Sequence, residues 1–410
     1  MTSESWLLLL AILGTLGAVF HQAILFVFAV IGLLMALASW VWQRACFSGV
    51  TYRRLLGQRR AFFNEEVDLT LEVTNRKLLP LPWLEVEDEV PEALTFLDAD
   101  LTTSYKPRRR TLIHLCSPRW YERIRRRYRV RCAHRGLYEF GPATLRAGDL
   151  FGFSTQHHTV STMDHLIVYP RIVPLERLGL DAQGPFGDLV SPRTLWEDPA
   201  YVAGVRPYEA GDSPRRIHWK VSARLGRLRV KILEPTTHPR LALFLDMHTL
   251  RGHAWWAGYD PMLVELSIIV AASVAAWGAE HKLPVGLYVN GPRFRRAGMA
   301  TIAMPPSEHP QQLQAILEAL ATAAPVATTP LEDLLTAEMP ALPWGTSVLA
   351  IAAVPEPETI AMLRAARRIG RSAGLVVIGT NAGTVAADDL PVFPVQGEDA
   401  WRDLPHVALA

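Results

Sequence analysis

The sequence predicts a membrane-anchored protein in three parts: an N-terminal transmembrane helical hairpin, a small antiparallel β domain, and an α/β domain with a mostly parallel sheet. Three observations support this fold class. Residues 6–42 contain no Lys, Arg, Asp or Glu. The next segment alternates apolar and polar residues, as half-buried strands do. From about residue 240 onward, short apolar runs alternate with helix-like segments, as in parallel sheets covered on both faces.

The N-terminal apolar segment is too long for one membrane crossing. A single helix over residues 6–42 would be about 55 Å long at ~1.5 Å per residue, whereas the hydrocarbon core is about 30 Å thick. Two helices with a turn near His21 and Gln22 fit better, so residues 1–45 are predicted to form a hairpin. A signal peptide is the alternative, but the basic leader and the small-residue cleavage site are missing.

The charges beside this segment predict its orientation. Arginines 44, 53, 54, 59 and 60 follow the second helix, and only Glu4 precedes the first. Basic residues stay on the cytoplasmic side, so both termini and the bulk of the chain are expected in the cytoplasm, anchored in the inner membrane by two spans. Three cysteines, without CxxC spacing, suit a reducing compartment and argue against a disulfide framework.

Residues 50–170 are predicted to form a β-sandwich-like domain. Segments such as "EEVDLTLEVTN" alternate with period two, and Gly, Asn, Asp and Pro separate successive strands. Two basic runs, Arg108–Arg110 and Arg125–Arg127, raise the question of nucleic acid. Solvated arginines on the outer face of a strand explain them better, the formal net charge is only +2, and contact with anionic lipid is a third option. No nucleic-acid partner is expected.

The remainder of the chain is divided by composition. Residues 171–200 are rich in Pro and Gly and predict a linker or an ordered crossover loop. Residues 201–235 form a charged motif segment, and residues 236–410 form the α/β domain. Residues 261–279 are apolar enough for a third span, but Glu265 and the alternating context favour a buried helix.

The motif "VRPYEAGDSPRRIHWKVSARLGRLRVK" makes the chain resemble domain-of-unknown-function family 58. The matching positions are Arg206, Tyr208, Gly211, Asp212, Arg216, Ile217, Trp219, Lys220, Ser222, Ala223 and Arg224. A second matching segment is "RCAHRGLYEFGPATLRAGDLFGF". The resemblance implies a bacterial membrane-anchored protein with a von Willebrand factor A-like domain. It also implies a protein-interaction adaptor that works with a MoxR-type AAA+ ATPase and other membrane proteins of the same operon, rather than an enzyme.

The sequence also offers a metal-binding alternative. A von Willebrand factor A-like domain often carries a metal-ion-dependent adhesion site, Asp-x-Ser-x-Ser, whose carboxylate and hydroxyls suit Mg²⁺. Here the segment is "DMHTL": Asp246 is in place, but His248 and Leu250 stand where hydroxyls are needed. We therefore expect no cofactor, with weak Mg²⁺ binding at Asp246 as the alternative. An unrecognised hydrolase is a further alternative, although GxSxG, HExxH and P-loop motifs are absent from the sequence.

The motif segment is predicted to have two roles. Tyr208, Ile217, Trp219, Leu228 and Val230 are spaced as apolar anchors, with Trp219 as the main one, and "RLRVKIL" is predicted to add a strand to the sheet. The turn at Gly211 and Asp212 precedes Arg215 and Arg216, whose planar forks suit the carboxylates of a partner. Internal ion pairs, of Asp212 with Arg216 or Arg224, are the alternative.

Overall fold

The fold is taken from a computed structural model, which describes residues 12, 14–15, 19, 23–149, 155–181, 185–190, 196–209, 211–236, 239–252, 254, 257–293, 300–379 and 389–395. The chain divides into two compact units, Met1–Val168 and Tyr169–Ala410. Each unit has its own hydrophobic core.

The first unit begins with an apolar helix, α2 (Ala23–Ala45). Its Phe26–Ala45 stretch is long and apolar enough to cross a membrane, and most of its large side chains are exposed, as lipid-facing residues would be. The other predicted helix of the hairpin, and the turn at His21 and Gln22, lie almost entirely outside the described residues.

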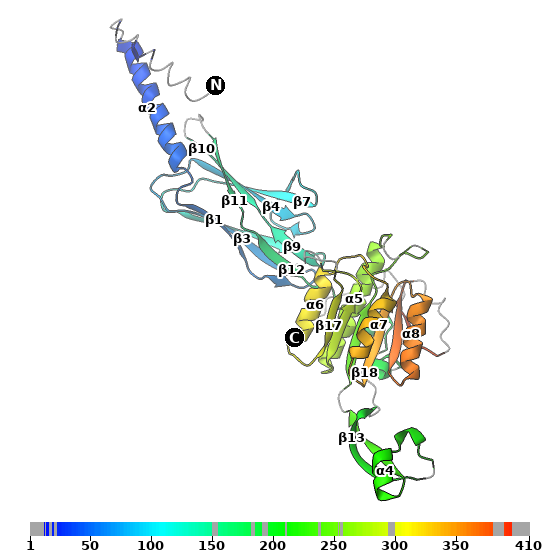
Figure 1. The fold of residues 1–410 in the computed structure, drawn as a ribbon. Helices are drawn as coiled ribbons and strands as arrows, with labels where there is room; N and C mark the ends of the chain where they lie inside the picture. The colour runs from blue at the N-terminus through cyan, green and yellow to red at the C-terminus, as the bar shows by residue number, and fades with distance from the viewer. Residues whose placement is uncertain are drawn as a thin grey trace. The chain divides into compact units, whose positions relative to one another are not determined.

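Antiparallel strands follow α2, as predicted (Figure 1). One sheet has the order β1-β3-β8-β5, a second β11-β10-β4-β7-β6 and a third β2-β12-β9. All pairs are antiparallel except β2 with β12. The strands are β1 (Val50–Leu56), β2 (Arg60–Ala61), β3 (Glu66–Asn75), β4 (Trp83–Pro91), β5 (Thr95–Phe96), β6 (Thr102–Thr103), β7 (Arg109–Cys116), β8 (Arg123–Arg131), β9 (Gly136–Phe140), β10 (Ala143–Gly148), β11 (Thr155–Val160) and β12 (Asp164–Val168).

The last turn of α2 belongs to the core of this β unit. Trp42 and Cys46 are buried in the same cluster as the inward-facing residues of β3 and β4, such as Leu69 and Leu84. Ser39 donates a hydrogen bond to Asp149, just beyond β10. The helix therefore continues into the β unit through packed contacts.

A buried ion pair joins two sheets of the β unit. Arg54 on β1 donates to Asp88 on β4 through Nε, at 2.6 Å, and Nη2, at 2.7 Å. The Tyr52 hydroxyl donates to the same carboxylate at 2.6 Å. The side chains of Arg54 and Asp88 are only 1% and 0% exposed. Removing either residue of such a buried pair would leave the other charge buried without compensation, which is strongly destabilising.

The second unit contains a six-stranded sheet in the order β17-β16-β15-β18-β19-β20. All neighbours are parallel except β16 and β17, which confirms a mixed, mostly parallel sheet. Its elements are β15 (Arg240–Leu245), α5 (Pro261–Glu280), β16 (Val285–Val289), β17 (Ile302–Ser307), α6 (Gln312–Thr322), α7 (Leu331–Glu338), η3 (Met339–Ala341), β18 (Thr346–Ala352), α8 (Pro357–Arg368), β19 (Ala373–Ile378) and β20 (Val392–Val395).

Two segments settle choices that the sequence left open. Helix α5 also passes the length and apolarity test for a span, but 72% of its apolar window is buried inside the unit, as the core-helix interpretation predicts. The predicted linker is in part packed structure: η1 (Leu175–Leu178) and α3 (Pro185–Val190) bury Leu175, Leu178 and Phe186. This agrees with the ordered-loop alternative; composition left both alternatives open because Pro and Gly punctuate ordered loops and linkers alike.

Candidate functional site

The family-like motif folds into a hairpin with a helix at its tip, here called the motif lobe (residues 202–232; Figure 1). Strands β13 (Trp196–Pro207) and β14 (Arg229–Thr236) form a two-stranded sheet of their own. Between them come η2 (Pro214–Arg216) and α4 (Trp219–Leu225). The prediction that "RLRVKIL" forms a strand is confirmed by β14. The prediction that this strand joins the main sheet is wrong, because β14 pairs with β13 in a separate sheet.

A few side chains hold the motif lobe together. Ile217 and Val230 are 7% and 1% exposed and form a bridge between their backbones. The Ser222 hydroxyl accepts a hydrogen bond from the Arg229 N–H at 2.9 Å. His218 Nδ1 caps α4 by accepting from the Val221 N–H. These residues of the motif have structural roles.

Arg206 and Asp212 form an ion pair within the lobe. Arg206 Nη1 donates to Asp212 Oδ2 at 2.8 Å, and Nη2 donates to Oδ1. The same carboxylate accepts from the Glu209 N–H at 2.9 Å, and the Arg206 hydrogen bonds lower the pKa of Asp212. Gly211 has φ +116°, a conformation that suits glycine. An internal ion pair was one of the two alternatives, and the cation that Asp212 binds directly is Arg206; the charge of Arg216 also lowers the pKa of Asp212.

Trp219 is not an apolar anchor. It is the first residue of α4, and 66% of it is exposed. Tyr208 and Leu228, two other predicted anchors, are 37% and 45% exposed. The prediction was wrong because a two-stranded lobe with one short helix has room for only a small core, which Ile217 and Val230 fill.

The exposed surface of the lobe combines apolar and basic side chains. Leu225 and Ile232 are also exposed, at 51% and 44%. Residues 206–231 contain eight basic and two acidic side chains, and Arg215, Lys220 and Arg224 are exposed. Trp, Tyr and Arg are the residue types that dominate protein–protein binding energy. The fold of the lobe does not require these exposed residues.

The comparisons with known proteins identify the motif. Residues 204–340 match the family model described as "Protein of unknown function DUF58". Over these residues the chain belongs to the DUF58 family. The resemblance inferred from the motif is thereby confirmed. A curated relative is the "Uncharacterized protein YeaD" of Bacillus subtilis (strain 168), 28% identical over 181 residues. The match covers 43% of each chain, so this DUF58 chain aligns with less than half the length of that relative.

Solved structures resemble parts of the DUF58 chain only weakly. A CARDB domain from Pyrococcus furiosus has a TM-score of 0.21 and 12% identity, covering 29% of this chain and 86% of that one. The sporulation control protein Spo0M of Bacillus subtilis has a TM-score of 0.17 and 12% identity, covering 30% of this chain and 49% of its own. Scores this low carry no argument about function.

Asp246 lies at the carboxyl end of β15, where α/β folds place ligands. It is buried, and its Oδ1 accepts from the His248 N–H at 2.9 Å and from Asn290 Nδ2 at 2.8 Å. Burial raises the pKa of Asp246 to about 6. Within the described ranges, no group of three or more His, Cys, Asp or Glu side chains is arranged to hold a metal ion. Asp246 therefore organises the backbone of the loop that follows β15.

The polar residues around Asp246 form hydrogen bonds within the protein. His248 lies with Nε2 3.0 Å from the Leu250 carbonyl. The Thr249 hydroxyl accepts from the Asp260 N–H at 2.7 Å, at the start of α5. Asn290 was missed from the sequence. It directly follows β16, the strand beside β15, so the adjacency of two strand ends was the signal that could have found it.

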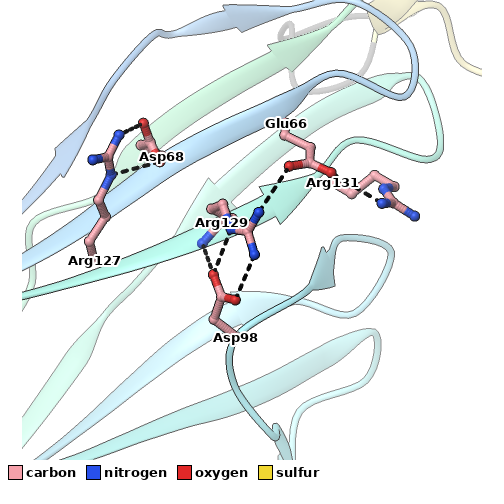
Figure 2. Close-up of polar contacts among 6 residues, drawn as sticks. All are labelled: Glu66, Asp68, Asp98, Arg127, Arg129 and Arg131. Atoms are coloured by element: carbon pink, nitrogen blue, oxygen red, sulfur yellow. Dashed lines mark hydrogen bonds and ion pairs between the residues drawn. The ribbon is translucent and has the colours of Figure 1, made fainter.

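Alternate arginines on β8, from Arg125 to Arg131, pair with carboxylates of neighbouring segments (Figure 2). Arg127 forms a bidentate salt bridge with Asp68 on β3. Arg129 contacts Asp98 at 3.0 Å, and Arg131 contacts Glu66 at 3.1 Å. Arg125 pairs in the same way with Glu72 at 2.7 Å. The run therefore forms a cross-strand charge ladder, which agrees with the solvated-strand interpretation.

Proposed function

We propose that this DUF58 protein is a membrane-anchored cytoplasmic adaptor whose motif lobe docks on an acidic surface of a protein partner. The observation that carries the proposal is the exposure of Trp219 among basic side chains on a lobe that needs neither for its own fold. By resemblance, a MoxR-type AAA+ ATPase is the partner. Arginine forks and an exposed indole suit an interface with carboxylates around an apolar centre.

The membrane anchor of the proposal is the hairpin. Support comes from α2 and from Ala29, which is 4% exposed although most of the large side chains around it on the helix are exposed. A Cβ built on Gly14 would lie 3.4 Å from the Ala29 Cβ, so two small residues would let neighbouring helices approach closely. The arginines that follow α2 support a cytoplasmic location of both units.

A von Willebrand factor A-like second unit is also part of the proposal. The parallel strands at the centre of its sheet, and an aspartate at the carboxyl end of β15, are features that such a domain would have. In this interpretation the unit serves as a scaffold for the motif lobe, and Asp246 serves the loop rather than a cation.

The proposed topology predicts where fused reporters work. Fusions of green fluorescent protein after residue 60 and after residue 410 should fluoresce, and alkaline phosphatase at the same points should be inactive, because both points are cytoplasmic. Active phosphatase at residue 60 would contradict the orientation. A soluble product with cleavage near residue 42 would contradict the anchor.

The proposed docking predicts that Trp219→Ala weakens partner capture by about 10- to 30-fold, the range of an interface hot spot. Lys220→Glu with Arg224→Glu should weaken it further by charge repulsion. The assay is a pull-down of a MoxR-type ATPase by the full chain in nanodiscs, with the melting temperature measured in parallel. We expect the melting temperature of each variant to stay unchanged, because Trp219, Lys220 and Arg224 are all exposed.

Two controls make this test specific. Trp344→Ala removes a partly exposed indole outside the lobe and should leave capture unchanged. Arg368→Glu reverses an exposed charge on α8 and should do the same. Unchanged capture by the Trp219 variant would refute docking through the lobe, and tight salt-dependent binding of single-stranded DNA by the lobe would assign it to a different partner class.

A further inference from the structure

The strand directions of the β unit bring several connections to the end where α2 enters. The pairings Val50 with Asn75 and Thr74 with Arg123 place the start of β1, the end of β3 and the start of β8 at one end of their sheet. In the other sheet, Leu84 pairs with Cys116 and with Ala147. The β3–β4 loop (residues 76–82) and the β7–β8 loop (residues 117–122) therefore lie at the α2 end.

These two loops are joined to each other and to the helix. Lys77 Nζ donates to the carbonyls of Ala45 and Cys46, at the end of α2. The buried amide of Asn75 donates to the carbonyls of Leu79, at 3.0 Å, and Arg119, at 2.9 Å. The loops are thus fixed at the level where a membrane-spanning α2 would leave the bilayer.

The outer surface of the loops is apolar and aromatic. Leu78, Trp120 and Tyr121 are 71%, 65% and 67% exposed, although nothing in the fold of the unit requires large apolar groups there. Tyr121 has φ +50°, an unusual conformation for a bulky residue. Tyr and Trp are enriched at membrane–water interfaces because their rings are amphipathic.

Basic side chains accompany these apolar groups. Arg76 and Arg119 are exposed on the same two loops. Arg44, in the last turn of α2, lies over the Trp40 ring at 4.1 Å. The cytoplasmic leaflet carries negative charge, which attracts Lys and Arg near the membrane. Apolar and aromatic residues beside basic ones match such a surface in both chemistry and position.

A groove between α2 and the β3–β4 loop extends this surface towards the bilayer. It has a volume of about 450 Å³. Its lining consists mainly of Leu34, Leu37, Val41, Trp42 and Leu79. Trp42 is buried, and its indole N–H has no hydrogen-bond partner among the residues that the structure describes. An acyl chain would fit the apolar walls of this groove.

We propose that the β3–β4 and β7–β8 loops form a second membrane contact, which docks the β unit on anionic phospholipid beside α2. Leu78, Trp120 and Tyr121 enter the interface, and Arg76 and Arg119 bind the phosphate headgroups. The inference rests on the proposed membrane anchor, since α2 sets the height of the loops. It assigns lipid contact to a region separate from the two basic runs of the β strands.

The test uses nitroxide labels on the full chain in nanodiscs that contain phosphatidylglycerol. Labels on Leu78→Cys and Trp120→Cys should lose accessibility to a water-soluble nickel reagent and gain accessibility to oxygen. The control is Tyr105→Cys. Tyr105 is 88% exposed and lies between β6 and β7, at the opposite end of the unit, so its label should stay open to nickel. The unmodified chain corrects for labelling of the native cysteines.

The possible results distinguish a failure of the second membrane contact from a failure of the membrane span formed by α2. A label on Leu33→Cys, within α2, reports the anchor: if it is open to nickel, the proposed membrane span fails. If Leu33 is protected while Leu78 and Trp120 are open, only the second contact is refuted. Arg76→Glu with Arg119→Glu should return the loop labels to water. Equal protection in nanodiscs of phosphatidylcholine alone would overturn the assignment to anionic headgroups.

Discussion

Replacing Arg54 with methionine should destabilise the β unit by about 3–5 kcal/mol, because it leaves a buried carboxylate without its cation. Asp88 is fully buried and would keep only the Tyr52 hydroxyl among the partners described above. Arg54 also donates to the Thr162 carbonyl at 2.7 Å, so that acceptor loses its donor too. The measurement is hydrogen–deuterium exchange of β1 and β4 in the full chain, read against denaturant concentration.

A second variant separates the cost of an orphaned charge from a loss of packing. Arg54→Met with Asp88→Leu should recover most of the lost stability, since apolar groups of similar volume replace a buried ion pair at little cost. The control is Arg127→Met, which breaks the exposed pair with Asp68 and should change stability by about 1 kcal/mol or less. If the double variant is less stable than Arg54→Met, the buried pair is not the source of the effect.

Asp246→Asn should stabilise the second unit at pH 8 by about 3 kcal/mol. The folded pKa of Asp246 is about 6, roughly two units above the value of about 3.9 for an unperturbed aspartate, and each unit corresponds to about 1.4 kcal/mol. The asparagine keeps an oxygen that accepts from the His248 N–H and from Asn290. It carries no charge, so the desolvation cost disappears.

The stability difference between the wild-type chain and the Asp246→Asn variant should depend on pH. Between about pH 4 and pH 6 the folded carboxyl holds its proton and the unfolded one does not, so the wild-type chain loses stability as the pH rises. Above about pH 6 the cost is complete and constant. The advantage of the asparagine variant should therefore be largest at pH 8 and vanish below about pH 4.

The measurement is the unfolding free energy of the second unit at several pH values. The matched control is Asp389→Asn, at an exposed position, whose effect should be small across the range. A variant that becomes relatively less stable above pH 6 would contradict the prediction. Mg²⁺ that stabilises the wild-type chain at pH 8, but not the variant, would show that the carboxylate is a metal ligand after all.

The fold class was readable from the sequence because it depends on periodicity. The apolar helix, the antiparallel strands of the first unit and the parallel strands of the second all follow from patterns that the chain repeats over many residues. Trp219 shows where such reasoning fails. Its size predicts burial, but burial depends on how many elements surround it, and the pairing of β13 with β14 isolates the lobe.

The polar partners were harder to foresee than the elements. Arg206 pairs with Asp212 because the hairpin brings the end of β13 beside the turn, a geometry that spacing alone does not specify. The Arg54–Asp88 pair joins strands that are not neighbours in either sheet. Side-chain pairing across sheets depends on packing, which no single-sequence pattern encodes.

The join between α2 and the β unit has a mechanical consequence. Trp42 and Cys46 belong to the core of the unit, and Lys77 holds the carbonyls at the end of the helix, so no flexible hinge separates the two. Helices respond to a thicker or thinner bilayer by changing their tilt. In a membrane, a change in the tilt of α2 would therefore rotate the β unit by the same angle. A change in bilayer thickness would in this way change the orientation of the β unit.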